Sequence, residues 1–173
     1  MNELCVRHLL REHRDVEKAL SELEFLLDEP VTGEPWSATR REDFQWIVET
    51  VASHLEHHIQ KEDDVLFPAL EAFLPRDLGP LAVLRGEHSD VRELFDRMCR
   101  AGQRCMYGNP SEGTREELSN SGLGVITLLR DHIYKEDRIL FPMVARFLSP
   151  ERDAALLHKM EEIDRTRHVL TAT

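Results

Sequence analysis

The sequence predicts an all-α protein, and three observations support this fold class. Of its 173 residues, 41% are hydrophobic and 32% are charged, while Gly, Tyr and Trp are few, a balance typical of helix-rich chains. Apolar residues recur at the spacing of one helix face in long stretches. A helical hairpin also occurs twice along the chain. The length suits a single domain over residues 1–173.

Clusters of Pro and Gly separate the apolar stretches and so place the helices. The first helix is expected to end before the segment Pro30–Pro35, the second before Pro75–Pro80, and the third before Gly108–Gly113. The apolar pattern resumes after the last cluster and gives a fourth helix. Together the four helices form a predicted core over about residues 3–148.

A fifth helix is expected over about residues 150–168. Ser149 and Pro150 form a helix-start pair, and the segment that follows is amphipathic. We expect this helix to pack on the outside of the bundle. Its amphipathic pattern also makes it the candidate surface for a homodimer.

The two halves of the chain repeat each other. Residues 58–68 read HIQKEDDVLFP and residues 132–142 read HIYKEDRILFP, while residues 12–16 read EHRDV and residues 87–91 read EHSDV. Duplication of a hairpin could by itself preserve good packing residues. The copies also share His and Glu, however, at positions that the apolar periodicity assigns to the core, and these need a chemical reason.

Six polar side chains are expected to face this core. In the fourth helix, Glu136 occupies the position between Ile133 and Leu140 on the apolar stripe. The other helices place His or Glu between apolar residues in the same way. The six residues are His13, His58, Glu62, His88, His132 and Glu136.

The chemistry of these six residues favours a metal centre. An ionised carboxylate in an apolar core needs a proton, a cation or a metal ion, and no Lys or Arg is expected on the inward stripe near Glu62 or Glu136. A His and a Glu four residues apart lie on the same helix face. Two metal ions would neutralise both carboxylates and could each receive two His and two Glu oxygens. A satisfied polar network in the core is the alternative.

The six residues, and the Leu-Phe-Pro that follows each His–Glu pair, resemble the hemerythrin family and its cation-binding HHE domains over residues 10–147. This resemblance implies a hemerythrin-like up-down-up-down four-helix bundle, here with an additional C-terminal helix. It implies two non-haem iron ions joined by an oxo, hydroxo or water bridge. It also implies that the four His are terminal ligands and that Glu62 and Glu136 bridge the irons. Zinc could replace iron in such a site.

Two positions depart from the oxygen-carrying members of that family. Those proteins have a further His one turn before the third-helix ligand, where this chain has Leu84 before His88. They also have an Asp five residues after the fourth-helix His, where this chain has Glu136 four residues after His132. The site therefore has four His in place of five. This difference argues against reversible oxygen carriage.

His54 lies one turn before His58 on the same face. It could be an extra metal ligand, a proton donor to bound peroxide, or a core histidine held by hydrogen bonds. Glu12, Glu56 and Glu87 lie beside ligand histidines in the sequence, and they could hold the ligand rings from outside the centre.

The surroundings of the site follow from the same periodicity. Surface positions are expected for His8, His57, His158 and His168, and an apolar wall over the irons is expected from Leu66, Phe67, Leu140 and Phe141. Pro68 and Pro142 are expected to kink or weaken the helices just beyond the site, because each lacks a backbone donor.

Several other partners and sites find no support. The formal net charge is −11 and no basic face is visible, so nucleic acid is not expected to bind. No apolar run approaches the ~20 residues of a membrane span, and the charged N-terminus lacks a signal-peptide core, so a cytoplasmic protein without a membrane partner is expected.

The three Cys are expected as reduced thiols. The Glu-x-x-His pairs of ferritin-like proteins, HExxH, phosphate-binding loops and nucleophile elbows are missing.

The leading functional hypothesis is therefore a non-haem di-iron protein that binds oxygen, peroxide or nitric oxide for sensing, storage or redox response. The alternative is an enzyme acting on peroxide or nitric oxide, or a protein of iron-sulfur cluster repair or iron donation. The repair group usually carries a short cysteine-bearing N-terminal domain, and none is expected before His13. A regulatory iron store or partner-binding module is a third hypothesis. The sequence assigns no catalytic residue.

Overall fold

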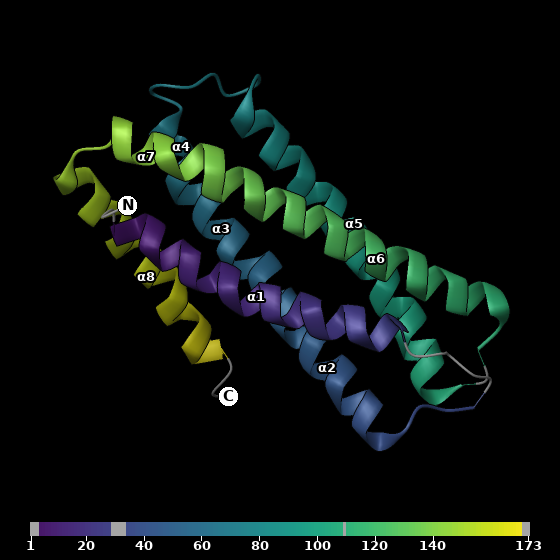
Figure 1. Ribbon diagram of the computed structural model, residues 1–173. Helices are drawn as coiled ribbons and strands as arrows, with labels where there is room; N and C mark the ends of the chain where they lie inside the picture. The colour runs from purple at the N-terminus through teal and green to yellow at the C-terminus, as the bar shows by residue number, and fades with distance from the viewer. Residues whose placement is uncertain (1–3, 29–33, 109, 171–173) are drawn as a thin grey trace.

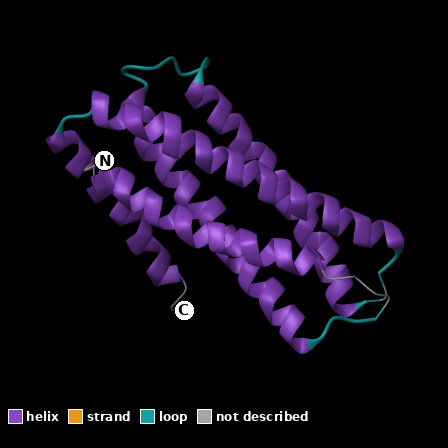
Figure 2. Cartoon of the chain, in the orientation of Figure 1, coloured by secondary structure: helices purple, strands orange, loops and turns teal. Residues whose placement is uncertain are grey.

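Four long helical segments run side by side in alternating directions and form an up-down-up-down bundle (Figure 1). This computed structural model describes residues 4–28, 34–108 and 110–170. Regular structure within these ranges is entirely helical (Figure 2). The all-α bundle with an added C-terminal helix is thereby confirmed, and none of the described helices is long and apolar enough to cross a membrane.

The first and third segments are single helices, whereas the second and fourth are each composed of several helical pieces. The first is α1 (Leu4–Asp28) and the third is α5 (Pro80–Tyr107). The second comprises α2 (Ala38–Ser53), η1 (His54–His58), α3 (Ile59–Lys61), η2 (Glu62–Leu66) and α4 (Phe67–Leu70). The fourth comprises α6 (Glu112–Lys135), η3 (Glu136–Leu140) and α7 (Phe141–Phe147).

The helix starts follow local sequence chemistry. Ser37 caps α2 by accepting a hydrogen bond from the Arg40 amide at 3.1 Å, and Ser111 caps α6 through the Thr114 amide at 3.2 Å. These hydroxyls satisfy amides that have no partner within the helix. Gly79 has φ +76° directly before α5, a conformation that favours glycine.

The labels η1, η2 and η3 denote turns of π-helix, in which each amide bonds five residues back. Two of them occupy equivalent places in the repeat, since η2 begins at Glu62 and η3 at Glu136. Pro68 and Pro142 each follow one of these turns and stand in the first turn of the next α-helix. The expected disturbance at the prolines is therefore a π-turn on the site side of each Pro.

The core divides into two apolar clusters with the polar site between them. One cluster includes Leu23, Phe44 and Met98 and fills the half of the bundle that contains α2. The other includes Leu66 and Leu140 and fills the half covered by the C-terminal helix. The ligand candidates are thus held between two packed layers, which restricts the movement of their helices.

The C-terminal helix α8 (Pro150–Leu170) lies beside α1 on the outside of the bundle (Figure 1). Leu156 and Met160 on this helix are buried in the second apolar cluster. Asp153 accepts hydrogen bonds from the Leu4 amide at 2.7 Å and the Cys5 amide at 3.0 Å. The apolar face that suggested a dimer surface is therefore packed against the same chain.

Candidate metal centre

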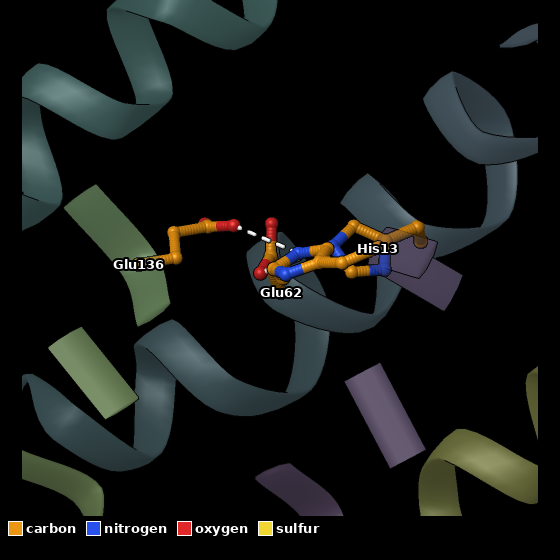
Figure 3. A group of neighbouring side chains, drawn as sticks. His13, Glu62 and Glu136 are labelled. Carbon is orange, nitrogen blue, oxygen red and sulfur yellow. Dashed lines mark hydrogen bonds and ion pairs between the residues drawn. The ribbon is translucent and has the colours of Figure 1, made fainter. Parts of the chain in front are cut away.

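The six polar residues singled out in the sequence meet in the middle of the bundle. They come from all four segments: His13 from α1, His58 from η1, Glu62 from η2, His88 from α5, His132 from α6 and Glu136 from η3. None of the six residues is more than 3% exposed. Figure 3 shows His13, Glu62 and Glu136 pointing toward one another.

Each glutamate lies between two histidines, with one carboxylate oxygen near each. The Oε1 atom of Glu62 is 3.4 Å from Nε2 of His58, and its Oε2 atom is 3.4 Å from Nε2 of His88. Glu136 does the same from the opposite side, with Oε2 3.2 Å from Nε2 of His13 and Oε1 3.2 Å from Nε2 of His132. Each carboxylate therefore spans two positions.

The donor atoms form two overlapping groups that could each hold a metal ion. The first position, as we call it, is surrounded by His13, His58 and one oxygen of each Glu, and the second position by His88, His132 and the other two oxygens. The facing Nε2 atoms are 3.0 Å apart in the first pair and 3.2 Å in the second. Two imidazoles and two carboxylate oxygens converge at each position.

The donor set fits metal ions because its carboxylates have no other partners. All four carboxylate oxygens of Glu62 and Glu136 are buried, and among the described residues only the four inward histidines lie within ion-pair distance of them. Buried polar atoms are nearly always satisfied, and an ion is one explanation for exceptions. Mixed imidazole and carboxylate donors suit iron and zinc.

A second layer of carboxylates holds the four histidine rings. The Nδ1 atom of His13 donates to Asp137 at 2.9 Å, and that of His88 to Asp63 at 3.2 Å. Glu12 accepts a hydrogen bond from Nδ1 of His58 at 2.9 Å, and Glu87 accepts one from Nδ1 of His132 at 3.0 Å. These contacts turn every Nε2 atom toward the centre and make the imidazole more basic.

Only part of this outer layer was predictable from the sequence. Glu12 and Glu87 contact rings of the candidate ligands as expected, whereas Glu56 is exposed to solvent. Asp63 and Asp137 were missed. Each of these aspartates directly follows a core Glu in the repeated Lys-Glu-Asp motif, so their retention in both copies was the available signal.

One expectation about cations was wrong. Lys61 is fully buried near the centre, although no Lys or Arg was expected there. Its ammonium group contacts Glu12 and Asp164, while the equivalent Lys135 contacts Glu87 and is 36% exposed. Neither lysine forms an ion pair with Glu62 or Glu136, so the inner carboxylates still lack a Lys partner among the described residues.

When no metal is bound, protonated histidines can balance the negative charge of the inner carboxylates. Burial alone would lower the pKa of His13, but hydrogen bonds to Asp137 and Glu136 raise it to about 10. Burial would likewise raise the pKa of Glu136, but His132 and His13 hold it well below its ordinary range. Metal ions and histidine protons are thus alternative partners for the same charge.

Aromatic rings close the site on the side of α4 and α7. Phe141 stacks on His13 with ring centroids 5.5 Å apart, and Phe67 stacks on His88 at 5.7 Å. Both phenylalanines, together with Leu66 and Leu140, are fully buried. These four residues form the apolar wall that the sequence predicted, and Leu84 is also buried beside it.

Comparison with known families supports this geometry. A model of the hemerythrin HHE cation binding domain matches residues 5–144. The chain belongs to this family. The match runs from α1 into α7 and includes all six inward residues, whereas α8 lies outside it.

Two relatives share part of this family region. The iron-sulfur cluster repair proteins YtfE of Salmonella newport (strain SL254) and Salmonella heidelberg (strain SL476) are each 30% identical to this chain over 89 residues. The aligned segment is 51% of this chain and 40% of each relative. The match therefore spans less than half of the relatives' length.

His54 lies outside both donor groups of this HHE domain. Its ring stacks on His58, with centroids 4.2 Å apart, and it is 6% exposed. Neither ring nitrogen has a hydrogen-bond partner within the described chain, so it is not the hydrogen-bonded core histidine considered above. Burial and the neighbouring His58 hold the pKa of His54 well below its ordinary value, which keeps the ring neutral.

The histidines expected at the surface divide into different environments. His158 is exposed as predicted, with 65% of its side chain accessible. His8 is instead partly buried, because Asp164 of α8 accepts a hydrogen bond from it at 2.9 Å. His57 is also partly buried and bonds to the Ser53 carbonyl at 3.1 Å. The side chain of His168 lies outside the described residues.

Proposed function

We propose that the protein is a non-haem di-iron protein in which Glu62 and Glu136 bridge two irons. The observation that carries this proposal is the division of each carboxylate between the two positions, with one oxygen facing each histidine pair. His13 and His58 would be the terminal ligands at the first position. His88 and His132 would hold the second.

We further propose that the centre binds a small ligand, namely oxygen, peroxide or nitric oxide, in sensing, storage or a redox response. Two imidazoles and two carboxylate oxygens at each position leave coordination sites that the described residues do not fill. Bound here, iron would supply a redox-active ion with exchangeable ligands. The buried phenylalanines around the rings exclude water from one side of the centre.

The iron content tests the first part of this proposal. After anaerobic reconstitution, metal analysis is expected to give about two irons per chain, and Glu62→Ala and Glu136→Ala are each expected to reduce this content strongly. Glu56→Ala is the matched control, since this Glu lies on the same segment but is exposed. Less than one iron per chain in the unmodified protein would overturn the di-iron assignment.

The choice among ligands requires spectra of the ferrous protein before and after anaerobic addition of oxygen, peroxide or nitric oxide. A stable new spectrum with oxygen supports a binding role. Rapid oxidation with consumption of added peroxide supports an enzyme. Absence of any spectral change with all three additions would overturn the small-ligand proposal.

Iron-sulfur cluster repair or iron donation is a second candidate, and the similarity to the two YtfE proteins favours it. This role requires iron to leave the centre, whereas sensing requires it to stay. Transfer of iron from the loaded protein to a cluster-depleted acceptor distinguishes the two. Transfer no faster than from free ferrous iron would exclude the donor role.

A further inference from the structure

His54 differs from every other buried histidine of the centre in its hydrogen bonding. Each of the four candidate ligand histidines has an outer carboxylate on Nδ1, but both nitrogens of His54 are without a partner among the described residues. Leaving a buried imidazole unsatisfied is unfavourable. A hydrogen-bond partner for these ring nitrogens must therefore come from outside the described chain.

A cleft of 470 Å³ between α1 and α2 leads to this ring. Trp46, Ser53 and His57 line the cleft, and His54 and His58 form part of its lining as well. His54 is beside the first position, because its ring centroid is 4.2 Å from that of His58 and 6.1 Å from that of His13. The cleft thus leads from solvent to the buried residue that carries the two unsatisfied nitrogens, beside the centre.

A comparable cleft on the other side of α1 lacks this feature. It has a volume of 550 Å³ and reaches His13 between α1 and the fourth segment. There, the outward Nδ1 atom of His13 is already bonded to Asp137, which also lines that cleft. A cleft that reaches the centre is therefore not sufficient to leave a histidine nitrogen without a hydrogen-bond partner.

The repeat shows that packing does not require a histidine at this place. In the second copy of the hairpin the corresponding residue, four positions before His132, is Leu128, which packs on the first apolar cluster. The π-turn η1 that begins at His54 also has no counterpart there, since α6 is α-helical through Lys135. π-turns of this kind occur frequently at functional sites.

We infer that His54 is the hydrogen-bond partner of the small ligand at the first position and that this ligand arrives through the α1–α2 cleft. This inference deepens the proposed function and rests on it. An imidazole ring offers at least one N–H donor, so it can stabilise a ligand with an oxygen or nitrogen acceptor atom. His54 is then a positioning residue for the exogenous ligand and not a seventh ligand of the metals.

Azide is a suitable probe, because it is a small hydrogen-bond acceptor that binds ferric iron and changes its absorption spectrum. We would titrate the reconstituted, oxidised protein with azide and measure the dissociation constant. His54→Leu copies the residue of the other repeat. It is expected to keep two irons per chain and to weaken azide binding about tenfold, the effect of one lost hydrogen bond. His54→Gln retains a donor and should recover part of the affinity.

His57→Ala is the matched control, since His57 lines the same cleft but bonds to the Ser53 carbonyl; it should leave azide affinity unchanged. If His54→Leu keeps its full iron content and its azide affinity is unchanged, the proposed role of His54 is overturned while the di-iron proposal stands. Loss of iron from His54→Leu, with its helical circular dichroism retained, would also overturn it by making His54 a ligand. Less than one iron in the unmodified protein would instead overturn the di-iron proposal on which the inference rests.

Discussion

The ammonium group of Lys61 contacts the carboxylate of Asp164 and so connects α8 to the second helical segment. The same ammonium contacts Glu12, whose other oxygen accepts the Nδ1 hydrogen bond of His58. A continuous chain of polar contacts therefore runs from the C-terminal helix to a ligand candidate.

Replacement of this lysine should destabilise the fold. In Lys61→Met, the carboxylates of Glu12 and Asp164 would lose the ammonium group that they share, and we expect the free energy of unfolding to fall by about 2 kcal/mol. Urea denaturation of the metal-free protein measures this change. Lys135→Met is the matched control, because the equivalent side chain is 36% exposed and should matter by less than about 1 kcal/mol. Equal effects of the two substitutions would contradict the burial argument.

Removal of an outer carboxylate should weaken metal binding without removing a ligand. In Asp63→Ala, the ring of His88 loses the acceptor that orients it, and we expect iron affinity to fall about 10–100-fold. Competition with a chelator gives the affinity. The neighbouring Asp64 is exposed, so Asp64→Ala should behave like the unmodified protein. An unaltered affinity in Asp63→Ala would show that the outer contact does not tune the centre.

The stability of the metal-free protein should decrease as the pH rises. Burial opposes protonation of the rings, but the neighbouring carboxylates raise the pKa of His13 to about 10 and that of His88 to about 9. The folded protein thus binds protons more tightly than the unfolded chain, whose histidines have a pKa of 6.5. This contribution is complete below pH 6.5 and is lost as the pH approaches 9–10.

We therefore expect the free energy of unfolding of the metal-free protein to fall by more than about 1 kcal/mol between pH 7 and pH 10. Denaturant titrations at several pH values measure it. In the iron-loaded protein the ring nitrogens are occupied by metal, so this dependence should largely disappear. A flat profile for the metal-free protein would show that the histidines are not protonated there.

Close packing at Gly102 gives a prediction that does not depend on metal. A methyl group at this position on α5 would overlap the ring of Phe44, which is itself buried. Gly102→Ala should therefore cost about 1–3 kcal/mol of stability. Gly86 lies on the same helix with open space around it, so Gly86→Ala should stabilise by about 0.5–1 kcal/mol. Thermal unfolding compares the two variants, and a stabilised Gly102→Ala would contradict the packing.

Most of the fold could be predicted because its signals are local. The segments of Pro and Gly separate the four helical segments, and Pro150 begins α8 as expected. The π-turns could not be predicted, since an α-turn and a π-turn have no distinct residue pattern. The burial of Lys61 was missed because its partner Asp164 lies on α8, about a hundred residues away in the sequence.

The inward face of the site was predictable because the repeat showed it twice. The six side chains converge as the periodicity indicated, while their binding of iron stays a prediction. The roles of Asp63 and Asp137 depend on the angle between neighbouring helices, which no periodicity reports. Their position beside Glu62 and Glu136 was visible only as part of the repeated motif.

Three differences between the two copies of the hairpin gather at one end of the centre. His54, the buried Lys61 and the α8 contact adjoin the first position, whereas the second has Leu128 and the more exposed Lys135. Two ions with matching ligands would therefore experience unequal electric fields and unequal solvation. Mössbauer spectra of the loaded protein should resolve two kinds of iron, and a single added electron would reside preferentially on one of them.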